Sequence, residues 1–260
     1  MERRTAERGH PLSPVSSDGQ RGADPLKRDY RKWQSSALGR DMEMLVFGEG
    51  GTPVLVFPTS MGRFFQWEDF GMIAHMAPRI DAGWLQLWCV DSVDSESFYD
   101  RTKAPQERAA RHVAYESYLV EEVLPAIRNE NQVDYLVVAG ASFWAFHALS
   151  FTTRRPGIAR KAIGLSGAYD AARWLGGSRE GEAYYVNPLT FLPNLKDERS
   201  LEPLRETEIV IATGRDDPNA EESRRLVAAL QEKGVPASLH VWDGWAHDWP
   251  YWKEMVDVFL

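Results

Sequence analysis

Residues 135–145 read YLVVAGASFWA, and this stretch decides the fold. Its first five residues form a short apolar run, which is typical of a strand buried on both faces of a sheet. Ser142 follows, and a helix is expected from about residue 143. A serine on a sharp turn between a strand and a helix is the arrangement called a nucleophile elbow, which exposes the hydroxyl above the sheet. The same residues also fit a serine that only caps the helix.

Apolar runs of similar length alternate with amphipathic segments along the chain. Strands are expected at 30–36, 41–47, 53–57, 84–90, 135–139, 161–165, 209–212 and 238–242. Helices are expected at 66–78, at 106–128 with a kink at Pro125, from about 143, at 219–233 and at 250–259. This alternation predicts an α/β fold in which helices cover both faces of a mostly parallel central sheet.

The composition predicts one globular domain. The chain has 260 residues, of which 43% are hydrophobic, and its formal net charge is −8. Residues 1–28 are rich in Pro, Gly, Ser and charge, and we expect a disordered tail there and a single domain over residues 29–260. The acidic balance argues against a nucleic-acid partner and against binding to an anionic membrane. No apolar run approaches the roughly 18 residues of a transmembrane helix.

Cysteine content indicates a reducing compartment. Cys89 is the one cysteine, so an intrachain disulfide and a cysteine-based zinc cluster are both excluded. Residues 1–25 contain no apolar segment of the kind found in secretory signals. A cytoplasmic protein is therefore expected.

Candidate catalytic residues each follow a strand of the predicted sheet. Ser142 follows the strand at 135–139, Asp217 follows the strand at 209–212, and His247 follows the strand at 238–242. This chain order of serine, aspartate and histidine is that of the α/β-hydrolases. Asp217 is favoured as the acid, and Asp216 and Asp170 remain alternatives.

Two backbone amides are candidates for an oxyanion hole. The N–H of Phe143 lies at the start of the helix after Ser142, where a developing negative charge is stabilised. The loop after the strand at 53–57 supplies the second N–H in this fold. Ser60 is the favoured donor and Thr59 is the next candidate.

Polar and aromatic residues near these loops are candidates for a substrate pocket. The loop after the strand at 84–90 contains Asp94 and Ser95, and it should lie beside the serine. Its acidic residues lack the spacing of a calcium loop, and the chain has no zinc-ligand pattern, so neither a metal nor another cofactor is expected. Trp245 belongs to a cluster of tryptophans around His247, which indicates either packing or an aromatic wall for the substrate.

Several stretches together resemble the putative esterase family, the esterase D-type branch of the α/β-hydrolases, which is related to the mycolyltransferases. They are VLVFPTS at 54–60, VDSVDSES at 90–97, EVLPAI at 122–127, GASF at 140–143 and GWAHDWP at 244–250. The resemblance covers about residues 30–260 and implies an α/β-hydrolase fold without a large cap.

Carried over residue by residue, the resemblance implies that Ser142 is the nucleophile, His247 the base and Asp217 the acid, with Phe143 and Ser60 as oxyanion donors. Trp144 and Met61 depart from the family pattern, because small residues are usual at both positions. Both lie next to the reacting centre, which makes them candidates for shaping the substrate pocket.

Three functions fit these observations. The first is a serine-dependent hydrolase of small-molecule carboxylic esters. The second is an acyltransferase that uses the same three residues. The third is a catalytically silent binding protein of the same fold, which the departures at Trp144 and Met61 motivate.

Overall fold

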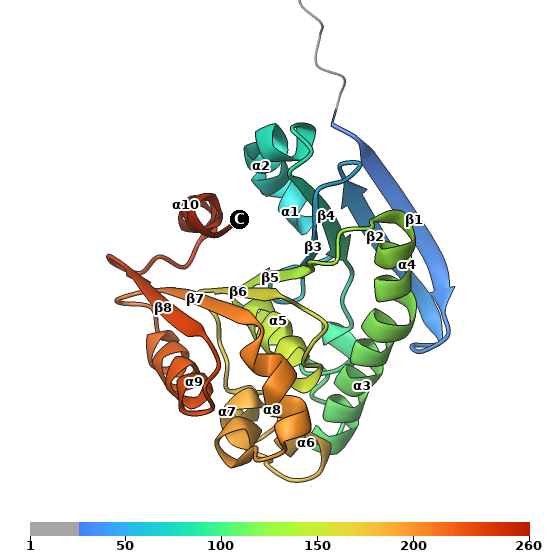
Figure 1. The fold of residues 1–260 in the computed structure, drawn as a ribbon. Coiled ribbons are helices and arrows are strands. Elements are labelled where there is room, and N and C mark those ends of the chain that lie inside the picture. The colour runs from blue at the N-terminus through green and yellow to red at the C-terminus, as the bar shows by residue number, and fades with distance from the viewer. Residues whose placement is uncertain (1–25) are drawn as a thin grey trace, which may run out of the picture.

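A single eight-stranded sheet forms the centre of the computed structural model, which describes residues 26–260 (Figure 1). Its strands are β1 (Arg28–Ser35), β2 (Arg40–Phe47), β3 (Thr52–Val56), β4 (Leu85–Val90), β5 (Val137–Ala141), β6 (Lys161–Leu165), β7 (Glu208–Gly214) and β8 (Ala237–Trp242). The spatial order is β1-β2-β4-β3-β5-β6-β7-β8. β2 pairs antiparallel with both β1 and β4. The remaining neighbours, β4-β3-β5-β6-β7-β8, all pair parallel.

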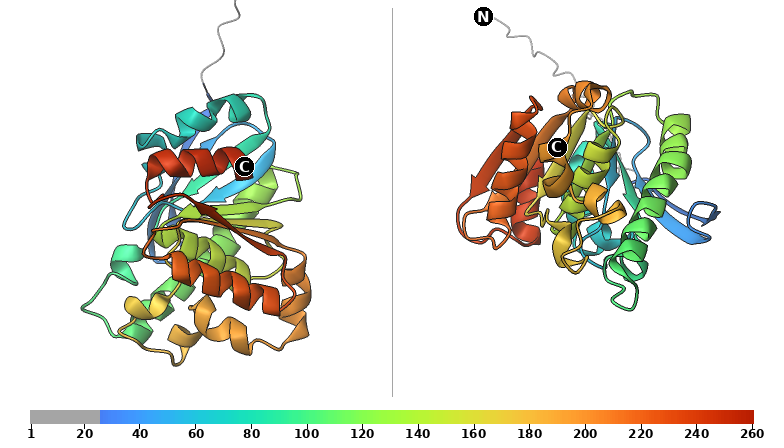
Figure 2. Two further views of the ribbon diagram at one scale, coloured as in Figure 1. Left: turned by 90° about the vertical axis from the view of Figure 1, so that its left-hand side faces the viewer. Right: turned by 90° about the horizontal axis from the view of Figure 1, so that it is seen from below.

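Helices cover both faces of the sheet (Figures 1 and 2). One face carries α1 (Gln66–Asp69), α2 (Met72–Asp81) and α10 (Trp249–Phe259). The other carries α3 (Pro105–Tyr118), α4 (Leu124–Glu130), α5 (Phe143–Arg154) and α9 (Ala220–Glu232). In β3, Leu55 faces one core and its neighbours Val54 and Val56 face the other. This burial on both faces explains why β3 reads as a continuous apolar run.

The predicted α/β architecture is confirmed, and the strands differ from the prediction mainly at their ends. The predicted tail lies outside the described residues except for 26–28, and Arg28 already begins β1. Among the described residues, no helix is long and apolar enough to cross a membrane.

Two predicted helices are interrupted. The segment 66–78 divides into α1 and α2 at Gly71, whose φ of 70° is left-handed and stops the first helix. The segment 106–128 contains a π-helical turn, η2 (Leu119–Val123), between α3 and α4. Pro125 lacks an N–H and its ring crowds the carbonyl four residues earlier. The distortion is therefore placed in the turn before the proline, and the predicted kink in the last turn is wrong.

Residues 166–207 hold several short helices that the sequence pattern does not predict. They are η3 (Ala171–Arg173), α6 (Glu182–Tyr185), α7 (Pro188–Phe191), η4 (Leu192–Asn194) and α8 (Glu198–Arg205), and the loop after β4 holds a further short helix, η1 (Asp94–Glu96). Most are a single turn long, which is too short to show an apolar period of 3.6 residues. Side-chain caps start three of them, from Asp170, Asn187 and Asp197.

Leu55 offers a direct test of the two-sided core. Its side chain is fully buried in β3, so Leu55→Ala should lower the free energy of unfolding by about 2–5 kcal/mol. Val258 is 65% exposed, and Val258→Ala should change the same quantity by less than about 0.5 kcal/mol. Urea denaturation of both variants measures the difference, and equal midpoints would contradict the described packing.

Candidate active site

Ser142 lies on a strained turn between β5 and α5. Its φ of 57° and ψ of −129° fall in a region that residues other than glycine rarely adopt. The Ser142 N–H donates to the carbonyl of Leu165 in β6 at 2.8 Å. Gly140 permits the turn, since a Cβ there would lie 2.3 Å from the Trp144 carbonyl oxygen. The geometry is that of a nucleophile elbow.

His247 and Asp217 meet Ser142 at the carboxyl edge of the sheet. The Ser142 Oγ lies 3.0 Å from His247 Nε2, and His247 Nδ1 lies 2.8 Å from Asp217 Oδ2. Asp217 is 5% exposed, and its other carboxyl oxygen accepts the Asn219 N–H at 2.8 Å. These contacts hold the carboxylate against the ring nitrogen that faces away from the serine.

The two alternative acids lie elsewhere. The Asp216 side chain is exposed, although Asp217 is its neighbour in the chain. Asp170 accepts the Ala172 N–H at 3.1 Å and the side-chain amide of Asn187 at 2.7 Å, so it caps η3. Of the three candidates, Asp217 is the one whose carboxylate contacts His247.

Ser166 supports the histidine loop, and the sequence reasoning missed it. Its Oγ donates to the Ala246 carbonyl at 2.7 Å and accepts from Trp252 Nε1 at 3.1 Å. Ala246 has a φ of 40°, so this hydrogen bond fixes a strained residue directly before His247. The signal available in the sequence was a serine that directly follows a buried strand, as Ser142 does.

The two backbone amides predicted to form an oxyanion hole have no protein acceptor among the described residues. Phe143 is the first residue of α5, where N–H groups have no partner within the helix. In the loop after β3, the Thr59 N–H donates to the side chain of Gln66, and the Met61 N–H donates to Asp94 Oδ2 at 3.1 Å. Within residues 26–260, the Ser60 N–H between them donates to no protein atom. Ser60 is thus an amide of this loop that remains available, as are those of Arg63 and Phe64.

The predicted pocket residues divide into a surface group and a buried group. Met61 and Trp245 are 50% and 51% exposed, and Ser95 is also exposed. Trp245 stacks on the His247 ring with centroids 5.5 Å apart. Asp94 is 1% exposed and Trp144 is fully buried.

Trp144 therefore does not form a wall of an open pocket, contrary to expectation. Its indole stacks on His147 at 3.9 Å and on Phe57 at 5.9 Å, inside the core between α5 and the sheet. A helical side chain points back along its helix onto the neighbouring turn and the surface beneath it. At this position that surface is the apolar face of β3, so the indole of Trp144 fills space in the hydrophobic core. The Ser142 hydroxyl therefore stays in contact with His247.

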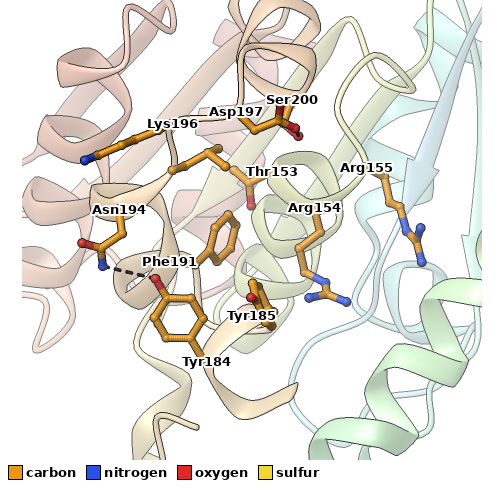
Figure 3. A pocket seen from close by; sticks show the side chains of 11 residues that line it. Thr153, Arg154, Arg155, Tyr184, Tyr185, Phe191, Asn194, Lys196, Asp197 and Ser200 are labelled. Carbon is orange, nitrogen blue, oxygen red and sulfur yellow. Dashed lines mark hydrogen bonds between the residues drawn. The ribbon is translucent and has the colours of Figure 1, made fainter. Parts of the chain in front are cut away.

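A cavity of about 440 Å³ lies at the opposite end of α5 (Figure 3). Its walls include Thr153 and Arg154, the last residues of that helix, together with Tyr185 and Phe191. The helix has 12 residues, so its two ends are about 18 Å apart. The cavity is therefore separate from the site at Ser142.

The acidic residues of the loop after β4 are engaged by protein groups. Asp91 accepts from Arg63 Nε at 2.7 Å, and Glu96 accepts from Arg111 at 2.6 Å. Burial raises the pKa of Asp91, and the Arg63 guanidinium opposes that rise. No cluster of three or more histidine, cysteine or acidic side chains in the described part of the chain is arranged to hold a metal ion.

Comparison with known proteins identifies the class. The profile of the putative esterase family matches residues 35–258, and the chain belongs to that family. No curated protein sequence matches the chain.

Solved structures of similar fold include three hydrolases. One is a ferulic acid esterase, with a TM-score of 0.73, 17% identity, and coverage of 90% of this chain and 96% of that one. An S-formylglutathione hydrolase from Agrobacterium tumefaciens has a TM-score of 0.70, 15% identity, and coverage of 90% and 93%. A fluorophosphonate-binding serine hydrolase from Staphylococcus aureus has a TM-score of 0.65, 14% identity, and coverage of 91% and 97%. Together they establish the esterase type of α/β-hydrolase fold for this chain.

Gly140 tests the geometry of the elbow. Gly140→Ala places a Cβ against backbone atoms of Trp144 that cannot rotate away, so it should lower the free energy of unfolding by about 1–3 kcal/mol. Gly50→Ala is the matched control, since a Cβ at Gly50 meets no atom within 4 Å. If both variants unfold at the same urea concentration, the turn does not have the described shape.

Proposed function

We propose that this protein is a serine-dependent hydrolase of small-molecule carboxylic esters. The observation that carries the proposal is the continuous contact from Ser142 Oγ to His247 Nε2, at 3.0 Å, and from His247 Nδ1 to Asp217 Oδ2, at 2.8 Å. A serine hydroxyl needs a base to become a nucleophile, and the base needs a third group that orients it. Membership of an esterase family supports ester hydrolysis as the reaction.

In the proposed reaction, Ser142 Oγ attacks the acyl carbonyl carbon while His247 Nε2 takes the hydroxyl proton. The tetrahedral intermediate then collapses, and the imidazolium returns that proton to the leaving alcohol. Water attacks the resulting acyl-serine with His247 again as the base, and the carboxylic acid leaves. Asp217 keeps the imidazole in the tautomer whose Nε2 is free to accept the proton.

The N–H groups of Phe143 and Ser60 would stabilise the oxyanion of each tetrahedral intermediate. Both amides lack a protein acceptor in the described part of the chain, and Phe143 also lies at the positive end of α5. A single donor of this kind contributes about 3–4 kcal/mol to transition-state stabilisation in a comparable site. The half-exposed side chains of Met61 and Trp245 border the same region and are proposed contacts for the substrate.

The structural relatives are named for different substrates, so none of those substrates is transferred to this chain.

Residues 29–260 are proposed to act as one domain without a large cap. The buried single thiol of Cys89 agrees with the proposed cytoplasmic location.

Acyl transfer would use the same acyl-enzyme and differs only in the nucleophile that accepts the acyl group. The silent binding protein is less well supported, because Trp144, one of the two residues that motivated it, is packed in the core, and the other, Met61, is half exposed. The Trp144 indole therefore leaves the Ser142 hydroxyl beside His247.

Ser142 is tested by a fluorophosphonate probe and intact mass. The wild type should gain the mass of one adduct, and Ser142→Ala should gain none, because the variant has no activated hydroxyl. Ser238→Ala is the matched control, since Ser238 Oγ also lies 3.1 Å from a histidine nitrogen, that of His240, but in a strand. It should label like the wild type. Labelling of the Ser142→Ala variant would contradict the assignment of Ser142 as the nucleophile.

Asp217 and Asp216 form a second test, because they are adjacent carboxylates with different surroundings. Asp217→Asn should lower kcat for p-nitrophenyl acetate by about 10³- to 10⁴-fold, since an amide donor favours the wrong histidine tautomer. Asp216→Asn should leave kcat at the wild-type level, because its side chain is exposed and does not contact His247. The reverse ranking of the two variants in steady-state assays would identify Asp216 as the acid.

A further inference from the structure

Asp94 is a buried carboxyl group that the proposed reaction does not use. It is 1% exposed, and its Oδ2 accepts the Met61 N–H at 3.1 Å. Its Oδ1 lies 3.3 Å from Nε2 of His147, which is also 1% exposed. Burying such groups costs free energy unless they are well paired, so a pair at this depth calls for an explanation.

The position of this pair connects the two amides proposed for the oxyanion hole. Met61 directly follows Ser60 in the loop after β3. His147 lies on α5, the helix that begins with Phe143. The Asp94 carboxyl thus bridges the loop that presents one amide and the helix that presents the other.

The Met61 backbone also needs an external constraint. Its φ of 56° is left-handed, a conformation that is unfavourable for a residue with a side chain. The Met61 side chain is half exposed, so core packing does not hold it. The hydrogen bond to Asp94 is a contact that fixes the orientation of this peptide, and the adjacent Ser60 amide turns with it.

We propose that Asp94, backed by His147, is the positioning residue of the oxyanion loop: its carboxyl oxygen holds the Met61 N–H so that the Ser60 N–H points at the reacting carbonyl. This inference rests on the proposed function. Asp94 acts through the loop and does not touch the substrate.

The protonation state of Asp94 and His147 determines which of their atoms can donate and which can accept hydrogen bonds. Burial raises the pKa of Asp94 well above its usual value, and burial together with the nearby His112 lowers the pKa of His147 well below its own. Both shifts favour a neutral pair. A neutral carboxyl keeps one oxygen as the acceptor for Met61, and its other oxygen lies 3.3 Å from His147 Nε2 without a hydrogen bond between them in this structure. An asparagine has the same shape, with one acceptor and one donor in the corresponding places.

The experiment compares Asp94→Asn with Asp94→Leu. Asp94→Asn should keep kcat for p-nitrophenyl acetate close to the wild-type value. Asp94→Leu fills the space but removes the acceptor, and it should lower kcat about 10- to 100-fold with little change in KM, because the loss falls on the transition state. Inhibition by phenylboronic acid, which forms a tetrahedral adduct on serine, should weaken in parallel with kcat.

Glu222→Leu is the matched control for loss of a partly buried loop contact. The Glu222 carboxylate accepts the backbone N–H groups of Tyr169 and Asp170, at 2.7 and 2.8 Å, in the loop after β6. This variant should be destabilised but should keep the wild-type kcat. If it loses kcat as Asp94→Leu does, the effect is general destabilisation and the proposal is wrong.

Amide hydrogen exchange separates this proposal from the proposed function. Peptides covering residues 58–64 should exchange faster in Asp94→Leu than in the wild type and Asp94→Asn, whether or not the protein turns over esters. Unchanged exchange in Asp94→Leu overturns the positioning role, whereas absent turnover in the wild type overturns only the proposed function. If Asp94→Leu does not fold, Asp94→Asn decides the matter: a tenfold loss of its kcat contradicts the account.

Discussion

The strained turn at Ser142 is the constraint on which the rest of the site depends. Its backbone leaves the β5 direction abruptly, and the Ser142 N–H is held by the Leu165 carbonyl of β6. That hydrogen bond continues the parallel pairing of β5 and β6 by one residue beyond the strand. The sheet therefore determines where the serine stands, and the start of α5 places the Phe143 amide beside it.

The parallel arrangement then brings the remaining groups to the same edge. β6, β7 and β8 follow β5 in spatial order, so the loops after them lie successively farther from the serine. Asp217 and His247 leave the last two strands and return towards Ser142. Gly214 permits this return, because a Cβ there would lie 2.1 Å from the Trp245 carbonyl oxygen. Ser166 follows β6, which lies between β5 and β7, and it holds the histidine loop through the Ala246 carbonyl.

The sequence predicts the centre of the sheet well because β3, β4, β5, β6 and β7 are buried on both faces and read as apolar runs. It also predicts which loops carry the polar residues, since each candidate follows a strand. It favours Asp217 as the acid but leaves Asp216 as an alternative, because adjacent residues differ mainly in the direction that the turn gives them. The burial of Trp144 was not predictable either, since it depends on the volume left between α5 and Phe57.

Several polar contacts hold the loop after β3. Gln66 Nε2 donates to Thr59 Oγ1 at 2.7 Å, and Ser92 Oγ donates to the Gly62 carbonyl at 3.1 Å. Asp94 adds the contact to Met61. A backbone held in this way can keep an amide aimed at a developing charge without reorganising during the reaction, which is the condition for effective electrostatic stabilisation.

The most direct test of this account is a crystal structure of the fluorophosphonate-treated protein. The account predicts a phosphorus atom bonded to Ser142 Oγ, with the phosphoryl oxygen about 2.7–3.1 Å from the backbone nitrogens of both Phe143 and Ser60. A phosphoryl oxygen that points away from these two amides, or a phosphorus atom on another residue, would contradict it.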